Sequence, residues 1–164
     1  MRGVVVSGKA KRAILLLVVS FALTGFSGAL AQTKEAEGHA RERLIGAWHL
    51  VSLGEVGADG RVARAEGLKG TLIYTADGHM SVQIMYPPAQ SSLTNDYVLN
   101  GYEASFGRYD VDEAKHTLTH HVEGSITPGL VGKDLTRAFR FSDRRLIIQS
   151  ARADERWQAV WERY

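Results

Sequence analysis

The chain has 164 residues, 45% of them hydrophobic, and no cysteine, so neither disulfides nor thiol chemistry is available to it. It carries 20 Lys and Arg residues against 18 Asp and Glu residues, but four of the basic residues and none of the acidic ones lie within residues 1–31. Residues 32–164 therefore hold 16 basic and 18 acidic residues, a net charge of −2, and a chain without a basic patch is not expected to bind nucleic acid.

The first 31 residues have the pattern of a secretory signal peptide. Four basic residues precede an apolar run at residues 13–23, and Ala29-Leu30-Ala31 supplies the small residues of a cleavage site. The apolar run is shorter than the roughly 20 residues that a transmembrane helix needs. We therefore expect the signal to be removed, with no stable membrane anchor afterwards and a periplasmic or secreted mature protein.

One domain is expected after the signal. Residues 32–43 are polar and lack a clear apolar period, which predicts a flexible lead or a short helix running into the domain. The domain proper is expected at residues 44–164, a length typical of a single core. Its first predicted strand covers residues 44–53, which are rich in strand-forming residues.

A β-hairpin is predicted next, because Asp77-Gly78 separates two alternating runs at residues 70–76 and 79–86. An Asp-Gly pair in that position favours a type I′ turn, which needs positive φ at both residues. Pro87 and Pro88 end the second run, since neither can donate a ladder hydrogen bond. The irregular segment 86–100 that follows is expected to cover the mouth of the domain.

Five further strands complete the expected set, and Gly107 inside one of them predicts a bulge or a close backbone approach. Short connections and the lack of a long amphipathic helix favour an all-β fold, an eight-stranded antiparallel up-and-down β-barrel. A β-sandwich is the alternative, but it would need a Greek-key connection and these connections are short. The five strands are predicted at residues 102–111, 117–125, 135–141, 146–150 and 156–164.

Five short blocks stand out in the chain: Gly46-Ala-Trp48, Trp161-Glu-Arg163, and residues 74–82, 106–109 and 120–125. Taken together they resemble the lipocalin and calycin barrels, and in particular the bacterial and fungal lipocalin-like domain proteins. The resemblance spans residues 43–164 and implies that Trp48, on the first strand, packs under Arg163, on the last, at the closed end of the barrel. Such a cation-π contact is worth about 0.5–2 kcal/mol. Barrels of this family serve as carriers and occasionally as enzymes.

The strand at residues 117–125 divides into a polar and an apolar face, because adjacent strand residues point in opposite directions. His121 and Glu123 share the face that also carries Thr117, Thr119 and Ser125, whereas His120 lies with Leu118 and Val122. Adjacent histidines on opposite faces cannot readily ligate one ion, so no metal site is expected. A polar face turned inward would favour a binding cavity, and an apolar one a filled core.

Arg137 is predicted to share a strand face with Leu135, Phe139 and Phe141. A charge on such a face must find a partner, since burying it unpaired is costly. Two partners are open at this point: Glu123 of the neighbouring strand, and the carboxylate of a bound ligand.

Together these features predict a protein that binds or carries a small hydrophobic or amphipathic acid, without a cofactor. One alternative is an isomerase, cyclase or hydrolase of a small metabolite that uses His121 as acid or base. The other is a structural or interaction module of the cell envelope with a filled barrel. The expected ligand-binding residues are Arg137, His121, Glu123, Tyr109, Tyr74 and Tyr86.

Overall fold

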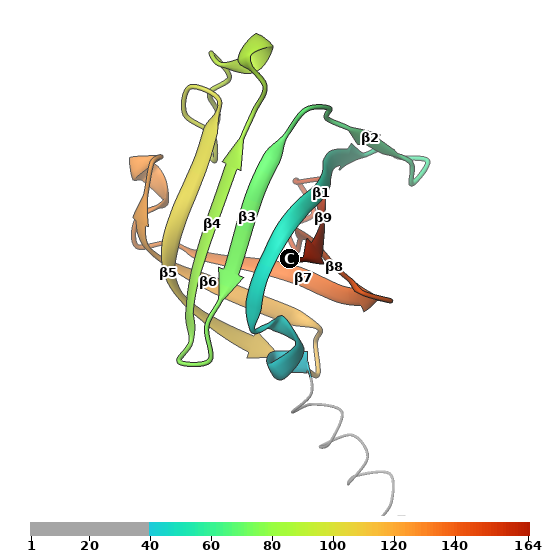
Figure 1. Ribbon diagram of the computed structural model, residues 1–164, viewed down its shortest axis with the longest axis vertical. Coiled ribbons are helices and arrows are strands. Elements are labelled where there is room, and N and C mark those ends of the chain that lie inside the picture. Colours follow the sequence, from blue (N-terminus) through green and yellow to red (C-terminus); the bar gives the residue numbers. More distant parts are fainter. Residues whose placement is uncertain (1–39) are drawn as a thin grey trace, which may run out of the picture.

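The computed structural model describes residues 40–164 (Figure 1). The expected signal peptide and residues 32–39 of the expected lead lie outside the described residues. Residues 40–44 form a short helix, and Ala40 and Leu44 pack against the core, so the end of the expected lead is fixed to the domain. Within residues 40–164 no helix has the length and apolar character needed to cross a membrane.

The described residues form nine antiparallel strands, of which eight close into a barrel. From β3 onward each strand pairs with the next along the chain, β1 pairs with β3, and pairing of β1 with β9 closes the ring. The predicted fold class is confirmed, with one addition, because β2 is a three-residue strand that pairs with the far end of β1. The strands are β1 (Gly46–Val56), β2 (Val62–Arg64), β3 (Lys69–Tyr74), β4 (His79–Met85), β5 (Tyr102–Asp112), β6 (Thr117–Ser125), β7 (Asp134–Ser142), β8 (Arg145–Ser150) and β9 (Trp157–Arg163).

The predicted hairpin is present between β3 and β4, but its turn differs from the expected type. Gly78 has a φ of 89°, whereas Asp77 does not adopt positive φ, so the turn is not type I′. The amide of Thr75 donates to the carbonyl of His79 at 2.9 Å, which makes a loop of residues 76–78 with Gly78 in the left-handed position. A type I turn followed by a left-handed glycine is the other common way to join two strands.

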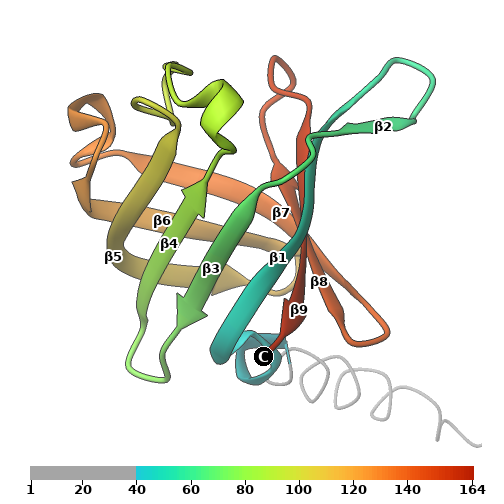
Figure 2. The ribbon, with the colours of Figure 1, turned by 45° about the horizontal axis from the view of Figure 1, so that its top comes forward.

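The two ends of the barrel differ. Figure 2 shows the segment between β4 and β5, which contains the short helix η1 (Pro88–Gln90), at the same end as β2, while helix 40–44 lies at the opposite end. At that closed end the Arg163 guanidinium lies 4.3 Å from the ring centroid of Trp48. Arg163 also donates to the main-chain carbonyls of Ile45 and Arg43, at 2.8 and 2.6 Å.

The pairing of β5 with β6 decides which side chains face inward. Leu118, His120 and Val122 are buried, so the inner face of β6 is its apolar face. The register shifts between Phe106 and Gly107, which leaves Glu123 as the extra residue on β6. The predicted close approach at Gly107 is confirmed, because a Cβ there would collide with the carbonyl oxygen of His121. The extra residue of the bulge, however, lies on β6 and not on β5, the strand that contains Gly107.

Candidate ligand-binding cavity

The barrel encloses a cavity of about 620 Å³ towards its open end. That volume lies within the range of small-molecule sites, roughly 300–1,000 Å³. The interior is therefore not filled by side chains, which counts against the expectation of a filled structural barrel. Much of the lining is apolar. Leu130 comes from the short helix η2 (Pro128–Leu130), and the strands contribute Leu53, Leu72, Val82, Ile84, Leu135, Ile148, Trp157, Ala159 and Trp161.

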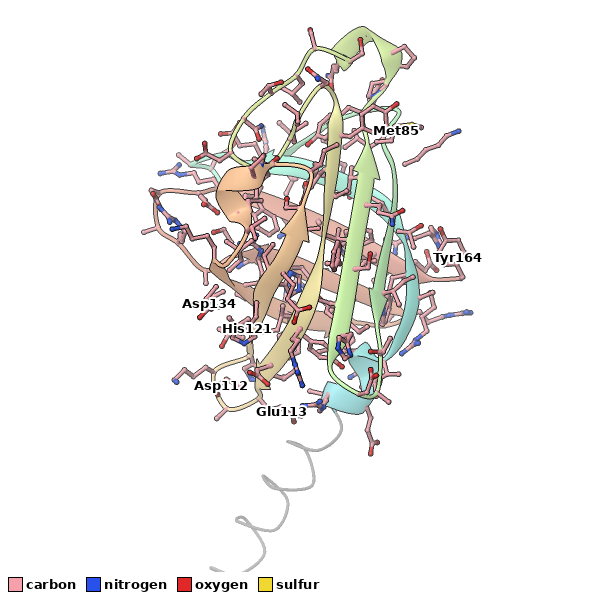
Figure 3. The ribbon with its side chains drawn as sticks, turned by 90° about the vertical axis from the view of Figure 1, so that its left-hand side faces the viewer. Met85, Asp112, Glu113, His121, Asp134 and Tyr164 are labelled. Carbon is pink, nitrogen blue, oxygen red and sulfur yellow. The ribbon has the colours of Figure 1, made fainter. Side chains whose placement is uncertain are left out.

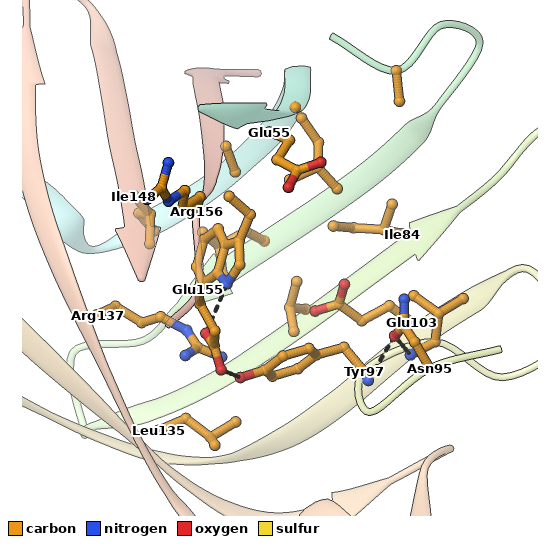
Figure 4. Close-up of a pocket in the computed structure, with 18 of the residues that line it drawn as sticks. Glu55, Ile84, Asn95, Tyr97, Glu103, Leu135, Arg137, Ile148, Glu155 and Arg156 are labelled. Carbon is orange, nitrogen blue, oxygen red and sulfur yellow. Dashed lines mark hydrogen bonds between the residues drawn. The ribbon is translucent and has the colours of Figure 1, made fainter. Parts of the chain in front are cut away.

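The segment between β4 and β5 contributes Asn95, Tyr97 and Val98 to the lining. Its shape is set locally, because the Asn95 side-chain oxygen accepts hydrogen bonds from the amides of Tyr97 and Val98, both at 2.9 Å. This Asx turn directs Val98 into a buried position and Tyr97 across the cavity (Figure 4). The position agrees with the expectation that residues 86–100 cover the mouth.

Arg137 is the fixed positive charge of the cavity. It projects from the inner face of β7, is only 6% exposed, and its guanidinium lies 4.8 Å from the ring of Trp157 and 5.3 Å from that of Tyr97. Among residues 40–164, no carboxylate lies within ion-pair distance of it. Glu123, one of its two predicted partners, is exposed on β6 and does not approach it. The guanidinium is thus buried, held by aromatic rings, and open to an anion.

Glu155 is a carboxylate beside the cavity whose oxygens accept three side-chain hydrogen bonds. Its carboxylate accepts hydrogen bonds from the hydroxyls of Ser150 at 2.7 Å and Tyr97 at 2.8 Å, and from the indole N–H of Trp157 at 3.0 Å. Burial acts to raise the pKa of Glu155, but these three donors and the charge of Arg137 lower it below its usual range. The charged carboxylate therefore links the mouth segment, through Tyr97, to the β8–β9 connection (Figure 4).

His120 and Tyr74 form a neutral hydrogen-bonded pair at the inner wall. The Tyr74 hydroxyl lies 2.8 Å from Nε2 of His120. Burial, with a smaller effect from the Arg137 charge, lowers the pKa of His120 to about 3, and burial also raises the pKa of Tyr74. The pair belongs to the cavity wall, because His120 is one of the lining residues.

Glu103 is a carboxyl group on the wall of the cavity. It stands on β5 opposite Ile84 and is half-buried. Burial raises its pKa to about 7, although the charge of Arg137 acts in the opposite direction. Within the described part of the chain no hydrogen bond or ion pair to this carboxyl is found. At neutral pH Glu103 therefore changes readily between its charged and neutral forms.

The predicted site residues fall into three groups. Arg137 and Tyr86 line the cavity, and Tyr74 supports its wall through His120. Tyr109 is buried nearer the closed end, where its hydroxyl donates to the carbonyl of Thr75 at 3.0 Å. His121 and Glu123 lie on the outer surface and do not line the cavity. Figure 3 shows the position of His121.

His121 finds its partners outside the barrel. Its Nδ1 lies 2.7 Å from Asp134 and its Nε2 lies 3.0 Å from Asp110. These carboxylates belong to the strands on either side of β6, so the polar face expected to line a cavity is satisfied on the surface. No group of three or more potential metal ligands occurs within residues 40–164.

The sequence prediction missed four cavity groups: Glu103, His120, Tyr97 and Glu155. Simple alternation backwards from Tyr109 would have put Glu103 on the same face, but Gly107 made the count across it uncertain. His120 was assigned to the apolar face, correctly, and that face is the inner one. Tyr97 and Glu155 lie in irregular segments, where no periodicity predicts the direction of a side chain.

Comparison with solved structures finds crystal structures of the fluorescent protein UnaG. The wild-type protein is 15% identical to this chain, and the match covers 75% of this chain and 98% of UnaG with a TM-score of 0.40. Two single-residue mutants of UnaG are 14% identical, with TM-scores of 0.40 and 0.39. Their matches cover 74% and 75% of this chain and 96% and 97% of theirs.

The search of curated proteins gave no match. The model of the lipocalin-like domain family, by contrast, matches residues 45–164, almost the whole of the described barrel. That match agrees with the resemblance carried by the Trp48 and Arg163 blocks. The chain belongs to the lipocalin-like domain family.

Proposed function

We propose that this protein is an exported carrier that holds a small, mainly apolar acid in its barrel, with the acid's carboxylate on Arg137. The observation that carries the proposal is the state of Arg137, a buried guanidinium in a largely apolar cavity with no carboxylate in ion-pair contact among residues 40–164. The proposal that the protein is exported rests on the signal-peptide pattern of residues 1–31.

A carboxylate suits this guanidinium on physical grounds. Arginine presents a planar fork of N–H donors that matches a carboxylate, and such charge-assisted bonds are stronger than neutral ones. The rings of Trp157 and Tyr97 limit the orientations of the fork, so little freedom is lost when the ligand binds. The apolar walls then accept the remainder of the molecule, whose burial supplies most of the binding free energy.

The test measures the affinity of the full chain for dodecanoate and for 1-dodecanol by calorimetry. Arg137→Leu should weaken dodecanoate binding by at least about tenfold, because a charged hydrogen bond contributes roughly 1.5–3 kcal/mol. It should leave 1-dodecanol binding nearly unchanged. Arg140→Leu is the matched control, since Arg140 lies on the exposed face of the same strand.

Two results would contradict the proposal. One is equal loss of affinity for the acid and the alcohol in Arg137→Leu. The other is a fall in melting temperature of Arg137→Leu without any change in dodecanoate binding. Native mass spectrometry of the protein from its own source, in search of a co-purifying acid, would identify the natural ligand.

The enzyme alternative finds no support at its chosen residue. His121 is held between Asp110 and Asp134 on the outer surface and cannot meet a molecule in the cavity. His120 does line the cavity, but with a pKa lowered to about 3 it is a weak base at neutral pH.

A further inference from the structure

We propose that the cavity takes up one proton together with each carboxylate ligand, and that Glu103 is the group that receives it. The consequence is a carrier that holds its acid more tightly at lower pH and releases it as the pH rises. This inference rests on the proposed function, because it concerns the same cavity and the same anionic ligand.

The proposal is supported by the position of two charged side chains, which come from separate strands and line the same cavity. Glu103 projects from β5 and Arg137 from β7, and both side chains point into the cavity (Figure 4). The charge of Arg137 acts on Glu103 across this space. No donor within residues 40–164 satisfies the Glu103 carboxylate, in contrast to Glu155, which has three. Of these two carboxyl groups, Glu103 is the one that can accept a proton without breaking a hydrogen bond.

The other titratable groups facing Glu103 do not compete for the proton. Burial raises the pKa of Tyr86 on the β4 side to about 12, and burial also raises the pKa of Tyr97 in the mouth segment. His120 on β6 is neutral, as its lowered pKa requires. The remaining charged lining residues stand at the exposed rim, where water screens them, and are Glu55, Arg64, Asp154 and Arg156.

A charge count within the cavity gives the direction of the effect. Arg137 already faces the charged carboxylate of Glu155. Glu155 is also paired with the exposed Arg152, at 3.3 Å. A ligand carboxylate bound to Arg137 adds a second negative charge, and an ionised Glu103 would add a third, against the two guanidiniums of Arg137 and Arg152. A like charge nearby disfavours ionisation of a carboxyl group, so ligand binding raises the pKa of Glu103 further. The proton comes from solvent, and no covalent bond of the ligand changes.

The sign of the pH dependence follows from linkage. A pKa that is higher in the complex than in the free protein means that the complex binds more protons. Affinity is then greatest below the free-protein pKa, which is about 7, and declines as the pH rises towards the pKa of the complex. Within that window the dissociation constant increases by up to about tenfold per pH unit, since one proton is taken up per ligand.

The experiment measures dodecanoate and 1-dodecanol affinity between about pH 6 and 9, where dodecanoate itself stays ionised. Calorimetry in phosphate and in Tris, whose heats of ionisation differ, counts the protons taken up. The wild-type chain should lose dodecanoate affinity above pH 7 and take up close to one proton, while its affinity for the alcohol stays flat. Glu103→Gln should bind dodecanoate with a flat pH profile and no proton uptake. Glu123→Gln, a change of an exposed carboxylate, should behave as wild type.

A flat dodecanoate profile in the wild-type chain, or the same slope in Glu103→Gln, would overturn the proton coupling and leave the role of Arg137 standing. Failure of dodecanoate to bind at any pH would overturn both proposals. If Glu103→Gln does not fold, carbon-13 NMR of the wild-type glutamate carboxyls provides the second measurement. A Glu103 titration midpoint that does not rise when dodecanoate is added would equally refute the inference.

Discussion

Replacing Arg163 by methionine should destabilise the barrel without altering its cavity. Arg163 closes the end opposite the mouth, where its guanidinium covers Trp48 at 4.3 Å and donates to the carbonyls of Ile45 and Arg43. A cation-π contact at an exposed site contributes about 0.5–1 kcal/mol. Each hydrogen bond adds about 1 kcal/mol. Methionine retains part of the packing over the indole, so the expected loss is roughly 2–3 kcal/mol.

Such a loss corresponds to a fall in melting temperature of about 10 °C for a domain of this size. Circular dichroism would measure it, with Arg140→Met as the control for removing an arginine from the outer surface. Hydrogen exchange should show the amides of residues 40–46 exposed first, because Arg163 holds that helix to the barrel. A melting temperature within about 2 °C of the control would refute the assignment of Arg163 as the tie between the first and last strands.

Two further predictions concern the mouth and the outer surface. Tyr97→Phe removes the hydrogen-bond donor to Glu155 but keeps the ring over Arg137. In stopped-flow measurements dodecanoate should therefore dissociate about tenfold faster from this variant than from the wild-type chain. Tyr102→Phe, at an exposed position, is the control, and an unchanged dissociation rate in Tyr97→Phe would contradict the role of the Tyr97–Glu155 hydrogen bond in holding the mouth segment. Hydrogen bonding to Asp134 raises the pKa of His121, and the contribution of this charge to stability is therefore present below about pH 6.5 and lost as the pH rises through the folded-state pKa. His121→Gln should accordingly lower stability by a few tenths to 1 kcal/mol at pH 6 in denaturant titrations, and an equal loss at pH 9 would argue against it.

The closed barrel was predictable because its evidence is local. Alternating runs, the prolines after β4 and the glycine of the β3–β4 turn each act within a few residues of their position. The turn type was predicted incorrectly because an Asp-Gly pair also suits a longer loop in which only the glycine takes positive φ. The short strand β2 escaped prediction, since three residues that pair with one neighbour leave almost no pattern in the sequence.

The orientation of β6 shows where local evidence ends. Alternation correctly separated His121 from His120, but it treats the two faces alike and does not tell which one turns inward. The orientation depends on the neighbouring strands, which supply Asp110 and Asp134 as partners for His121 on the outside of the barrel. The extra residue at Glu123 also reverses the phase of the strand, so Ser125 lies opposite inward-facing Ser105.

The sequence by itself determined the fold family, the order of the strands and the presence of a charge on an apolar strand face at Arg137. Only the tertiary structure decided what surrounds that charge. Glu103, Tyr97 and Glu155 come from three distant segments, and barrel closure brings them to one cavity. No local pattern relates them, because their mutual positions depend on strand register and on two irregular connections. For the same reason, the role proposed for Glu103 as the proton acceptor of this cavity could not be deduced from the amino-acid sequence.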